Sequence, residues 1–380
     1  MSVAIRLISN TSKRELKDFI LFNYRLYKGN PYAVPELYSD LMNTFMPSRN
    51  GAYDFCEAQL FMAYKDGKAV GRVAAIINRR ANETWKSNIV RFGWLDFVDD
   101  EEVSAALLTA VERWGRERGM DTIEGPLGFT DFDREGMLID GFDQLATMAS
   151  HYNYPYYVTH MEHLGYDKAV DWKQYKVFAP EVIPEKMQRV CNLVKDRYHL
   201  RVVNYTSGKK LKKERGQEIF ALMNEAYAPL HGYSELGERQ INQYIDTYLS
   251  LIDLRLVPMV FDENDRLIGV GIMMPSLSRA LQRAHGARHL WGYIPLAWAL
   301  YVKHEVNTDL LLIAVRPEYQ GKGVNALIMA HMVPVYQKLG YKYAETNLNL
   351  EDNTKVQSQW EYFEHINHKR NRAWIKKINQ

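Results

Sequence analysis

Apolar positions along the chain follow two periods, one of two residues and one of three to four. Apolar runs on both sides of Asp66-Gly67 predict a β-hairpin over residues 60–78, because Asp-Gly favours a tight turn between antiparallel strands. Helical spacing predicts helices over 14–27, which Thr11 or Ser12 can cap, and over 101–119. Further strands are expected at residues 4–8, 90–98, 121–129 and 171–178, and a further helix at 154–164.

The second half of the chain repeats this order of elements. It predicts a helix at 213–228, a hairpin at 256–274, a strand at 310–315 leading into a helix, a strand at 343–350, a helix at 353–363 and a strand at 372–378. Gly71 and residues 62–65 correspond to Gly269 and residues 259–262 when one extra residue is allowed in the second hairpin, which indicates a duplication. We therefore expect an α/β or α+β fold with two mixed sheets flanked by helices. The expected domains are residues 1–180 and 181–380, joined by a linker at 179–184.

Composition narrows the class of protein. With 380 residues, 47% hydrophobic and 25% charged, the chain has the composition of a globular protein. Its net charge of +2 does not favour binding to nucleic acid. The two cysteines lack a CxxC spacing, the histidines form no HExxH motif, and His160 and His163 are expected at the surface, so we predict no metal site. No secretory signal or spanning segment is visible, which predicts a cytoplasmic protein.

A strand, a glycine turn and a helix follow one another over residues 310–330. Leu310 to Val315 is an aliphatic run, typical of a strand buried on both faces. Gly321 and Gly323 can adopt positive φ, and the helix that follows begins with N–H groups that have no intrahelical partner. These groups and the helix dipole favour a phosphate, and Lys322 adds a positive charge.

The residue order in this turn resembles a known cofactor motif. Val315-x-Pro317-x-x-Gln320-x-x-Gly323-x-Asn325 is similar to the acyl-CoA-binding motif of the GCN5-related N-acetyltransferase (GNAT) superfamily, in which Gln/Arg-x-x-Gly-x-Gly/Ala encloses the pyrophosphate. Asn325 departs from this pattern, and its side chain either crowds the pyrophosphate or bonds to it. The resemblance implies acetyl-CoA or a longer acyl-CoA as cosubstrate. It assigns cofactor contacts to Ala314, Val315, Gln320, Gly321, Lys322, Gly323, Val324, Asn325 and Asn353.

The order of elements resembles a GNAT domain in both halves of the chain. In the first half the corresponding turn is Asp99 to Glu102, four consecutive carboxylates that would repel a pyrophosphate. The first domain is therefore expected to be a degenerate GNAT-like domain, and the second to carry the acyl-CoA site.

Candidate catalytic residues follow the cofactor helix. Alternation along 343–350 places Glu345, Asn347 and Asn349 on one face of a strand, either beside the substrate or on a solvated edge. Glu345, or alternatively Glu351, is the candidate general base for an amine, although Glu351 also suits an acidic helix start. The tyrosine that protonates the leaving thiolate in many GNAT proteins corresponds here to Trp360.

Two long segments interrupt the repeated pattern, at 125–157 and 278–302. The second is basic and then rich in Trp, Tyr and Leu, which suits a membrane surface, a long acyl-chain pocket or a packed helix pair. The resulting hypothesis is an acyl-CoA-dependent N-acyltransferase acting on a small amine or an amino-acid derivative. The alternatives are a non-catalytic module that binds acyl-CoA, a lipid or a partner protein, and an aminoacyl transferase like the Fem family.

Overall fold

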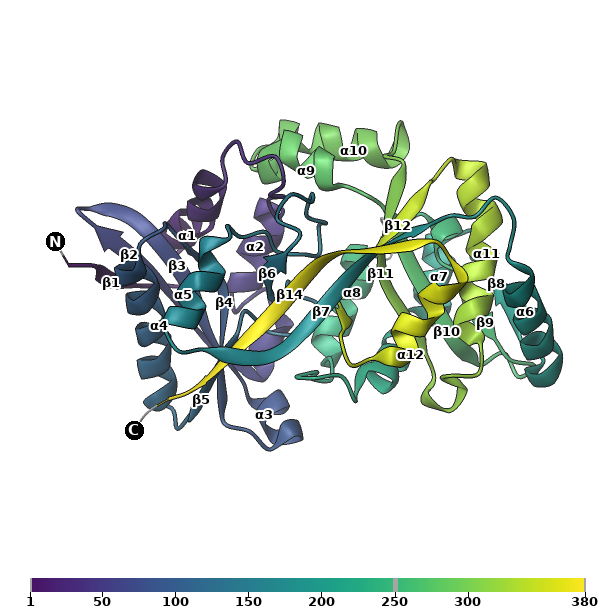
Figure 1. Cartoon of the computed structure of the whole chain (residues 1–380), viewed down its shortest axis with the longest axis horizontal. Helices are drawn as coiled ribbons and strands as arrows, with labels where there is room; N and C mark the ends of the chain where they lie inside the picture. Colours follow the sequence, from purple (N-terminus) through teal and green to yellow (C-terminus); the bar gives the residue numbers. More distant parts are fainter. Residues whose placement is uncertain (1, 249–251, 379–380) are drawn as a thin grey trace. The chain divides into compact units, whose positions relative to one another are not determined.

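The computed structural model describes residues 2–248 and 252–378, and the chain forms two compact units. Unit 1 contains residues 1–173, 277–299 and 369–380, and unit 2 contains residues 174–276 and 300–368. Each unit is a mixed β-sheet with helices on both faces, which confirms the predicted fold class (Figure 1). No helix in the described residues is long and apolar enough to cross a membrane.

The sheet of unit 1 is built mainly from consecutive antiparallel strands. Its order is β1 (Ala4–Ile8), β2 (Cys56–Lys65), β3 (Lys68–Asn78), β4 (Ile89–Phe97), β5 (Thr122–Gly125) and β14 (His365–Lys377, from Lys369 onward), with β6 (Met137–Asp140) also paired to β14. Only β4 and β5 pair in parallel among these strands. The predicted hairpin is present as β2 and β3, and Asp66 and Gly67 have the positive φ that its turn requires.

Two hydrophobic cores lie on opposite faces of this sheet. Phe61 and Ala63 of β2 face the core beneath α4 (Glu101–Arg116) and α5 (Tyr156–His163), whereas Leu60 and Met62 face the core beneath α1 (Lys13–Leu26) and α2 (Tyr38–Phe45). Alternate residues of one strand thus serve both cores, as a period of two requires. The short α3 (Arg79–Trp85) follows β3. Ser12 caps α1 by accepting a hydrogen bond from the Glu15 N–H, as predicted.

Unit 2 has a similar sheet that carries the strand, turn and helix noted in the sequence. Its order is β7 (Asp167–Phe178, from Gln174 onward), β12 (Tyr343–Thr346), β11 (Asn307–Val315), β10 (Leu267–Pro275), β9 (Met259–Phe261) and β8 (Arg201–Val203), with β13 (Asn349–Leu350) paired to β7. β11 and β12 are parallel. The helices α6 (Glu185–Tyr198) and α11 (Val324–Leu339) contact each other over one core, and α7 (Gly208–Tyr227) and α8 (Glu238–Tyr248) cover the other (Figure 1).

Several predicted boundaries are wrong. The strand expected at 343–350 breaks into β12 and β13, and the strand expected at 121–129 ends at Gly125. The helix expected at 353–363 is only α12 (Thr354–Gln357) followed by a 3-10 turn. The last strand begins at His365, not 372. The helices α2, α3, α6 and α8 were not predicted.

The compact units depart from a simple division at residue 180 in three segments. Residues 277–299, with α9 (Ser278–Ala284) and most of α10 (Tyr293–Tyr301), belong to unit 1. So does the chain from Lys369 onward, because Trp374 to Lys377 of β14 pair with β5. The end of the first half, Gln174 to Phe178, in turn belongs to unit 2, where β7 pairs with β12. Each unit therefore takes a strand from the other half of the sequence.

Candidate functional site

The parallel strands of unit 2 pair over only part of their length. Asn307–Leu310 of β11 are in register with Tyr343–Thr346 of β12, but β11 continues to Val315 after β12 has ended. The Asn347 N–H donates to the Leu310 carbonyl at 3.0 Å and closes the pairing. Beyond this point the side chains of residues 311–313 are partly exposed, although a strand buried on both faces was expected. Among the described residues no strand therefore pairs with the second half of β11 on this side, whereas β10 pairs with it on the other.

The turn after β11 presents free N–H groups at the start of α11. Gly321 and Gly323 have φ of +74° and +84°, and the Gln320 side chain donates to the Val315 carbonyl at 3.1 Å. Among the described residues, no acceptor bonds to the N–H groups of Gly321, Gly323, Val324 and Asn325. These donors and the positive end of the helix dipole suit a phosphate.

Lys322 adds a charge beside these N–H groups. Its ammonium lies 5.4 Å from the ring centre of Tyr198 and 5.5 Å from that of Tyr319. The aliphatic part of the predicted contact set, Ala314 and Val315, is buried at the end of β11.

Glu345 lies in a row of charged side chains across the sheet. It is 7% exposed, and it is in register with Asp309 of β11 and Lys176 of β7. The Nε2 atom of His368 is 3.5 Å from its carboxylate. The inward orientation predicted for Glu345 is confirmed. His368 escaped the sequence analysis because it lies on the part of β14 that was expected to be irregular.

Asn347 and Asn349 do not continue the face that Glu345 occupies, so the predicted row of three is wrong. The Asn347 side chain donates to the Leu311 carbonyl at 3.3 Å. The Asn349 side chain donates to the Thr346 hydroxyl at 3.0 Å and to the Asn347 carbonyl at 2.6 Å. Short amide side chains compete with strand hydrogen bonds in this way, and here they end β12.

The segment after β13 holds the remaining predicted residues. Asn353 caps α12, because its side chain accepts a hydrogen bond from the Val356 N–H at 3.2 Å. The Gln357 side chain donates to the Glu351 carbonyl at 2.8 Å. Trp360 is 1% exposed and belongs to the core beneath α11.

A tyrosine from a distant part of the sequence lies beside α12. The Tyr175 hydroxyl donates to the Gln357 side chain at 3.1 Å, and burial raises the pKa of Tyr175. Tyr175 is on β7, 182 residues before Gln357, so no local pattern could reveal this hydroxyl.

In unit 1 the place beside the corresponding strand is occupied by another part of the chain. β4 and β5 also pair over a short stretch, Ile89–Arg91 with Thr122–Glu124. However, the Leu127 N–H donates to the Phe92 carbonyl at 2.9 Å, and a Cβ added at Gly93 would lie 2.6 Å from the Leu127 carbonyl oxygen. The loop after β5 thus lies beside the second half of β4. In the described part of unit 2, the corresponding place beside β11 has no such loop.

The N-terminus of α4 in unit 1 is also occupied. Asp100 accepts a hydrogen bond from the Glu102 N–H at 3.0 Å, and its carboxylate is 2.7 Å from the ammonium of Lys65. A phosphate at this helix start would have to displace the Asp100 carboxylate, which already caps the helix and forms an ion pair with Lys65.

Comparison with known proteins agrees with this geometry. No family model matches the sequence. The chain is 26% identical over 389 residues to Protein YghO of Escherichia coli (strain K12), covering 97% of this chain and 94% of that protein. It is 28% identical over 345 residues to Bacterial ceramide synthase of Caulobacter vibrioides (strain NA1000 / CB15N), covering 89% and 88%. The solved structure of a tandem GNAT protein from the clavulanic acid biosynthesis pathway matches 100% of this chain and 99% of its own, with a TM-score of 0.58 and 10% identity. The chain has the tandem GNAT fold.

In this tandem GNAT fold, Gly323 faces a helix that the sequence analysis missed. A Cβ added at Gly323 would lie 2.8 Å from methyl groups of both Val190 and Val194 on α6. A side chain at this position would therefore meet α6 first. Substitution of Gly323 does not by itself report on a phosphate.

Gly323→Ala is expected to lower the free energy of unfolding by roughly 2–4 kcal/mol, because it combines a positive φ with overlap against Val190 and Val194. Gly340→Ala is the matched control: Gly340 ends the same helix with φ +78° and has no atom within 4 Å of an added Cβ. It should lose only about 1–2 kcal/mol. Denaturant unfolding measures both. Equal losses would contradict the assigned contact with α6.

Asn325, which departs from the GNAT motif, has an enclosed side-chain oxygen. Its Oδ1 atom is fully buried and has no hydrogen-bond partner in the described structure. An unpaired buried acceptor destabilises a fold by about 1–3 kcal/mol. A side chain kept at such a cost is consistent with a role at this helix start.

A serine, a histidine and an aspartate meet in unit 1. His160 Nδ1 is 2.8 Å from the Ser104 hydroxyl, and its Nε2 is 3.1 Å from Asp99. His160 is 3% exposed, so its expected surface position is wrong, whereas His163 is exposed beside Glu101. Because Ser104 is 0% exposed, its hydroxyl has no access to a substrate, and the group links α4 to α5.

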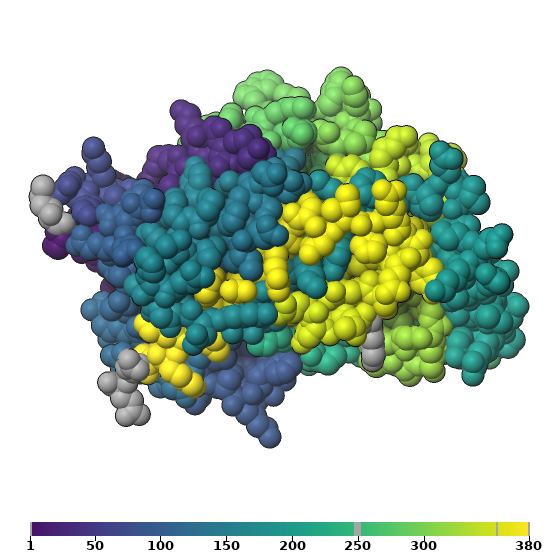
Figure 2. Space-filling view, viewed as in Figure 1, coloured from purple at the N-terminus to yellow at the C-terminus, as the bar shows by residue number. Residues whose placement is uncertain are grey.

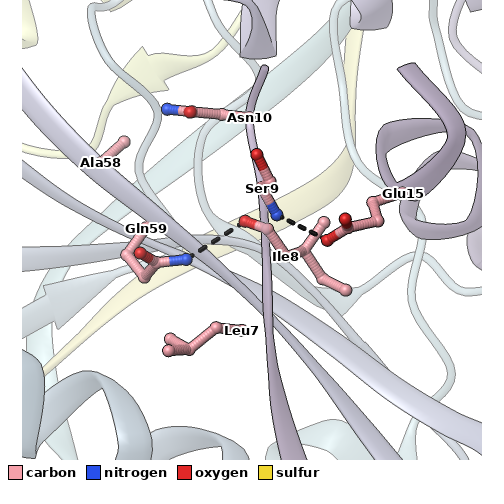
Figure 3. Close-up of a pocket in the computed structure, with 7 residues that line it drawn as sticks. All are labelled: Leu7, Ile8, Ser9, Asn10, Glu15, Ala58 and Gln59. Atoms are coloured by element: carbon pink, nitrogen blue, oxygen red, sulfur yellow. Dashed lines mark hydrogen bonds between the residues drawn. The ribbon is translucent and has the colours of Figure 1, made fainter. Parts of the chain in front are cut away.

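A shallow hollow in unit 1 offers no reactive group. It lies between β1 and β2, and Figure 3 shows two polar side chains turned toward the backbone of β1. Glu15 accepts from the Ser9 N–H at 2.9 Å, and Gln59 donates to the Ile8 carbonyl at 3.2 Å. No group of three or more metal-ligating side chains occurs in residues 2–248 and 252–378.

Proposed function

We propose that this protein is an acyl-CoA-dependent N-acyltransferase whose working site lies in unit 2. The observation that carries the proposal is the second half of β11, which pairs with β10 alone among the described strands. It runs directly into the turn where the N–H groups of Gly321, Gly323, Val324 and Asn325 have no acceptor among the described residues. One end of this feature suits a pyrophosphate. Beside the other end a thioester can lie next to β11, where side chains of Asn347 and Tyr227, and no strand among the described residues, bond to the Leu311 and Ile313 carbonyls. Unit 1 has both places filled by its own chain, which supports a single acyl-CoA site.

The donor is acetyl-CoA or a longer acyl-CoA. Its pyrophosphate is placed at the N–H groups of Gly321 to Asn325, with Lys322 beside it. The pantetheine arm and the acyl group then follow the exposed side chains of β11. A contact between Asn353, which caps α12, and the cofactor is also part of the proposal.

The reaction transfers the acyl group from sulfur to nitrogen. The neutral amine attacks the thioester carbonyl, a C–N bond forms, the C–S bond breaks, and the thiolate leaves as CoA after taking up a proton. Glu345, or failing that Glu351, accepts the proton that the amine loses. Asn347 and Asn349 position the end of β12, and the Tyr175 hydroxyl is a neutral proton donor beside α12.

The acceptor is an amine, and its class is suggested by the relatives. The sequence alone predicts a small amine or an amino-acid derivative. One relative at 28% identity is named Bacterial ceramide synthase, and a ceramide is the amide of a fatty acid with a long-chain amino alcohol. We therefore place a long-chain amino alcohol first among acceptors. The predicted cytoplasmic location remains a prediction.

Calorimetry and product analysis test the proposal. The full chain is titrated with acetyl-CoA and palmitoyl-CoA, and each mixture is then incubated with a sphingoid amine, a short amino alcohol and an amino acid. Mass spectrometry of an amide, together with release of free thiol, is the expected result. Absence of any amide over this panel contradicts the proposal.

A second candidate, a non-catalytic module that binds acyl-CoA, is favoured by Trp360. The indole at this position has no acidic proton near neutral pH, and it is enclosed in the core. Tight acyl-CoA binding in calorimetry without amide formation would assign the protein to this class.

A further inference from the structure

Exposed apolar side chains are concentrated in one stretch of the chain. Of the fourteen large apolar side chains that are exposed in the described residues, eight lie between residues 290 and 306. Leu290 is 82% exposed, Trp291 78% and Trp298 55%. In Figure 2 atoms of this stretch, in green, are open to solvent. Patches of this kind in soluble proteins mark interaction sites.

The helix in this stretch has apolar residues on every side. α10 contains no charged residue, and only Leu296 and Ala299 are buried. Most of its surface therefore faces water. Nine residues of helix extend about 14 Å, less than half of a bilayer core, so α10 can lie on a membrane but not cross it.

Basic side chains adjoin these apolar ones, and the first acidic residue after α10 in the chain is Glu305. Residues 278–304 contain no Asp or Glu. Arg279, Arg283 and Arg288 are exposed, and none forms an ion pair with a described residue. The whole chain has a net charge of only +2, so this is a local concentration of positive charge. It complements the phosphates of anionic lipids.

Hydrogen bonds hold residues 278–298 to the rest of unit 1. The Gln282 side chain donates to the Pro31 carbonyl at 3.0 Å and to the Ala33 carbonyl at 2.9 Å. The Tyr293 hydroxyl bonds to Ser39 at 3.0 Å. These contacts order the segment while leaving Leu290, Trp291 and Trp298 uncovered. Exposed side chains that are ordered in this way suit a surface contact better than the acyl-chain pocket that the sequence also allowed.

From these observations we infer that residues 278–298, the surface segment, bind the face of an anionic lipid bilayer. Trp291 and Trp298 enter the interfacial region, where amphipathic aromatic rings are favoured. Arg283 and Arg288 bind headgroup phosphates. The inference rests on exposure and charge in unit 1 and does not require acyl transfer in unit 2.

A vesicle sedimentation experiment tests the inference. The full chain is mixed with vesicles of phosphatidylcholine alone or with phosphatidylglycerol added. Binding should be at least tenfold stronger to the anionic vesicles and should weaken as salt is raised. Equal binding to the two vesicles, or no binding to either, overturns the inference.

Two double variants separate the apolar and the charged contributions. Trp291→Ala with Trp298→Ala should lower the partition coefficient at least tenfold, and Arg283→Glu with Arg288→Glu should abolish the preference for anionic vesicles. Trp85→Ala is the matched control, since Trp85 is an exposed tryptophan outside the surface segment at 40% exposure, and it should bind like wild type. Unchanged binding of the Trp291/Trp298 variant would overturn the inference.

A measurement on the wild type does not depend on variant folding. Tryptophan emission should shift to shorter wavelength on anionic vesicles, and brominated lipid should quench it.

Light scattering, which measures the molar mass in solution, adds a further outcome. If the wild type does not bind vesicles and is a dimer, and the Trp291/Trp298 variant is a monomer, then the surface segment binds a second copy of the chain. The membrane assignment would then be wrong.

Discussion

Glu345→Gln is expected to lower kcat by ~10²–10⁴-fold and to leave acyl-CoA affinity unchanged. Glu345 is enclosed near the point where β11 and β12 separate, and its carboxylate is the best placed of the predicted bases to take a proton from the amine. Steady-state kinetics over a range of pH measures the effect. The variant should also lose the limb of the pH–rate profile at low pH, because glutamine has no proton to release.

Asp309→Asn is the matched control for this change. Asp309 is a buried carboxylate in register with Glu345 on the same sheet, so the two substitutions remove similar charges from similar surroundings. The control should change kcat by less than tenfold and keep the low-pH limb. If Glu345→Gln retains full turnover, the proton leaves through solvent, and Glu345 with His368 has only a structural role.

Lys322→Glu is expected to weaken acyl-CoA binding by about 10- to 100-fold, which corresponds to roughly 1.4–2.8 kcal/mol. The change replaces a cation beside the free N–H groups of Gly321, Gly323, Val324 and Asn325 with an anion that repels the pyrophosphate. Calorimetry with acetyl-CoA gives the affinity. The difference should shrink as ionic strength rises, because Lys322 is exposed.

Lys338→Glu provides the same change of charge on the same helix. Lys338 is exposed in the last turn of α11, about 24 Å from Lys322 along the helix axis. Its substitution should leave acetyl-CoA affinity within about twofold of wild type at a Debye length of ~10 Å. If both variants lose affinity equally, the effect is one of net charge, and the pyrophosphate lies elsewhere.

Part of the candidate site could be predicted because it depends on neighbouring residues. The strand, the two glycines and the helix start at 310–330 were all foreseen, and the structure places positive φ at Gly321 and Gly323. Asp99 to Glu102 in the first half also predicted a turn unsuited to a phosphate, and in the structure Asp100 caps the start of α4. By contrast, the row of Glu345, Asn347 and Asn349 assumed a straight strand, and local amide bonds to Thr346 and Asn347 break it.

The sequence by itself determined the regular elements whose cause is local. Period-two alternation and Asp66-Gly67 specify the hairpin of β2 and β3, and helical spacing with a Ser12 cap specifies α1, because side-chain direction and turn geometry involve residues only a few positions apart.

Only the tertiary structure decided which distant segments meet. It brought His368 to Glu345, placed α6 against Gly323, filled the first unit's strand edge with Leu127, and left Trp291 and Trp298 uncovered. Contacts of this kind depend on which strands pair and which helices pack between residues far apart in the chain, and no local periodicity records those choices.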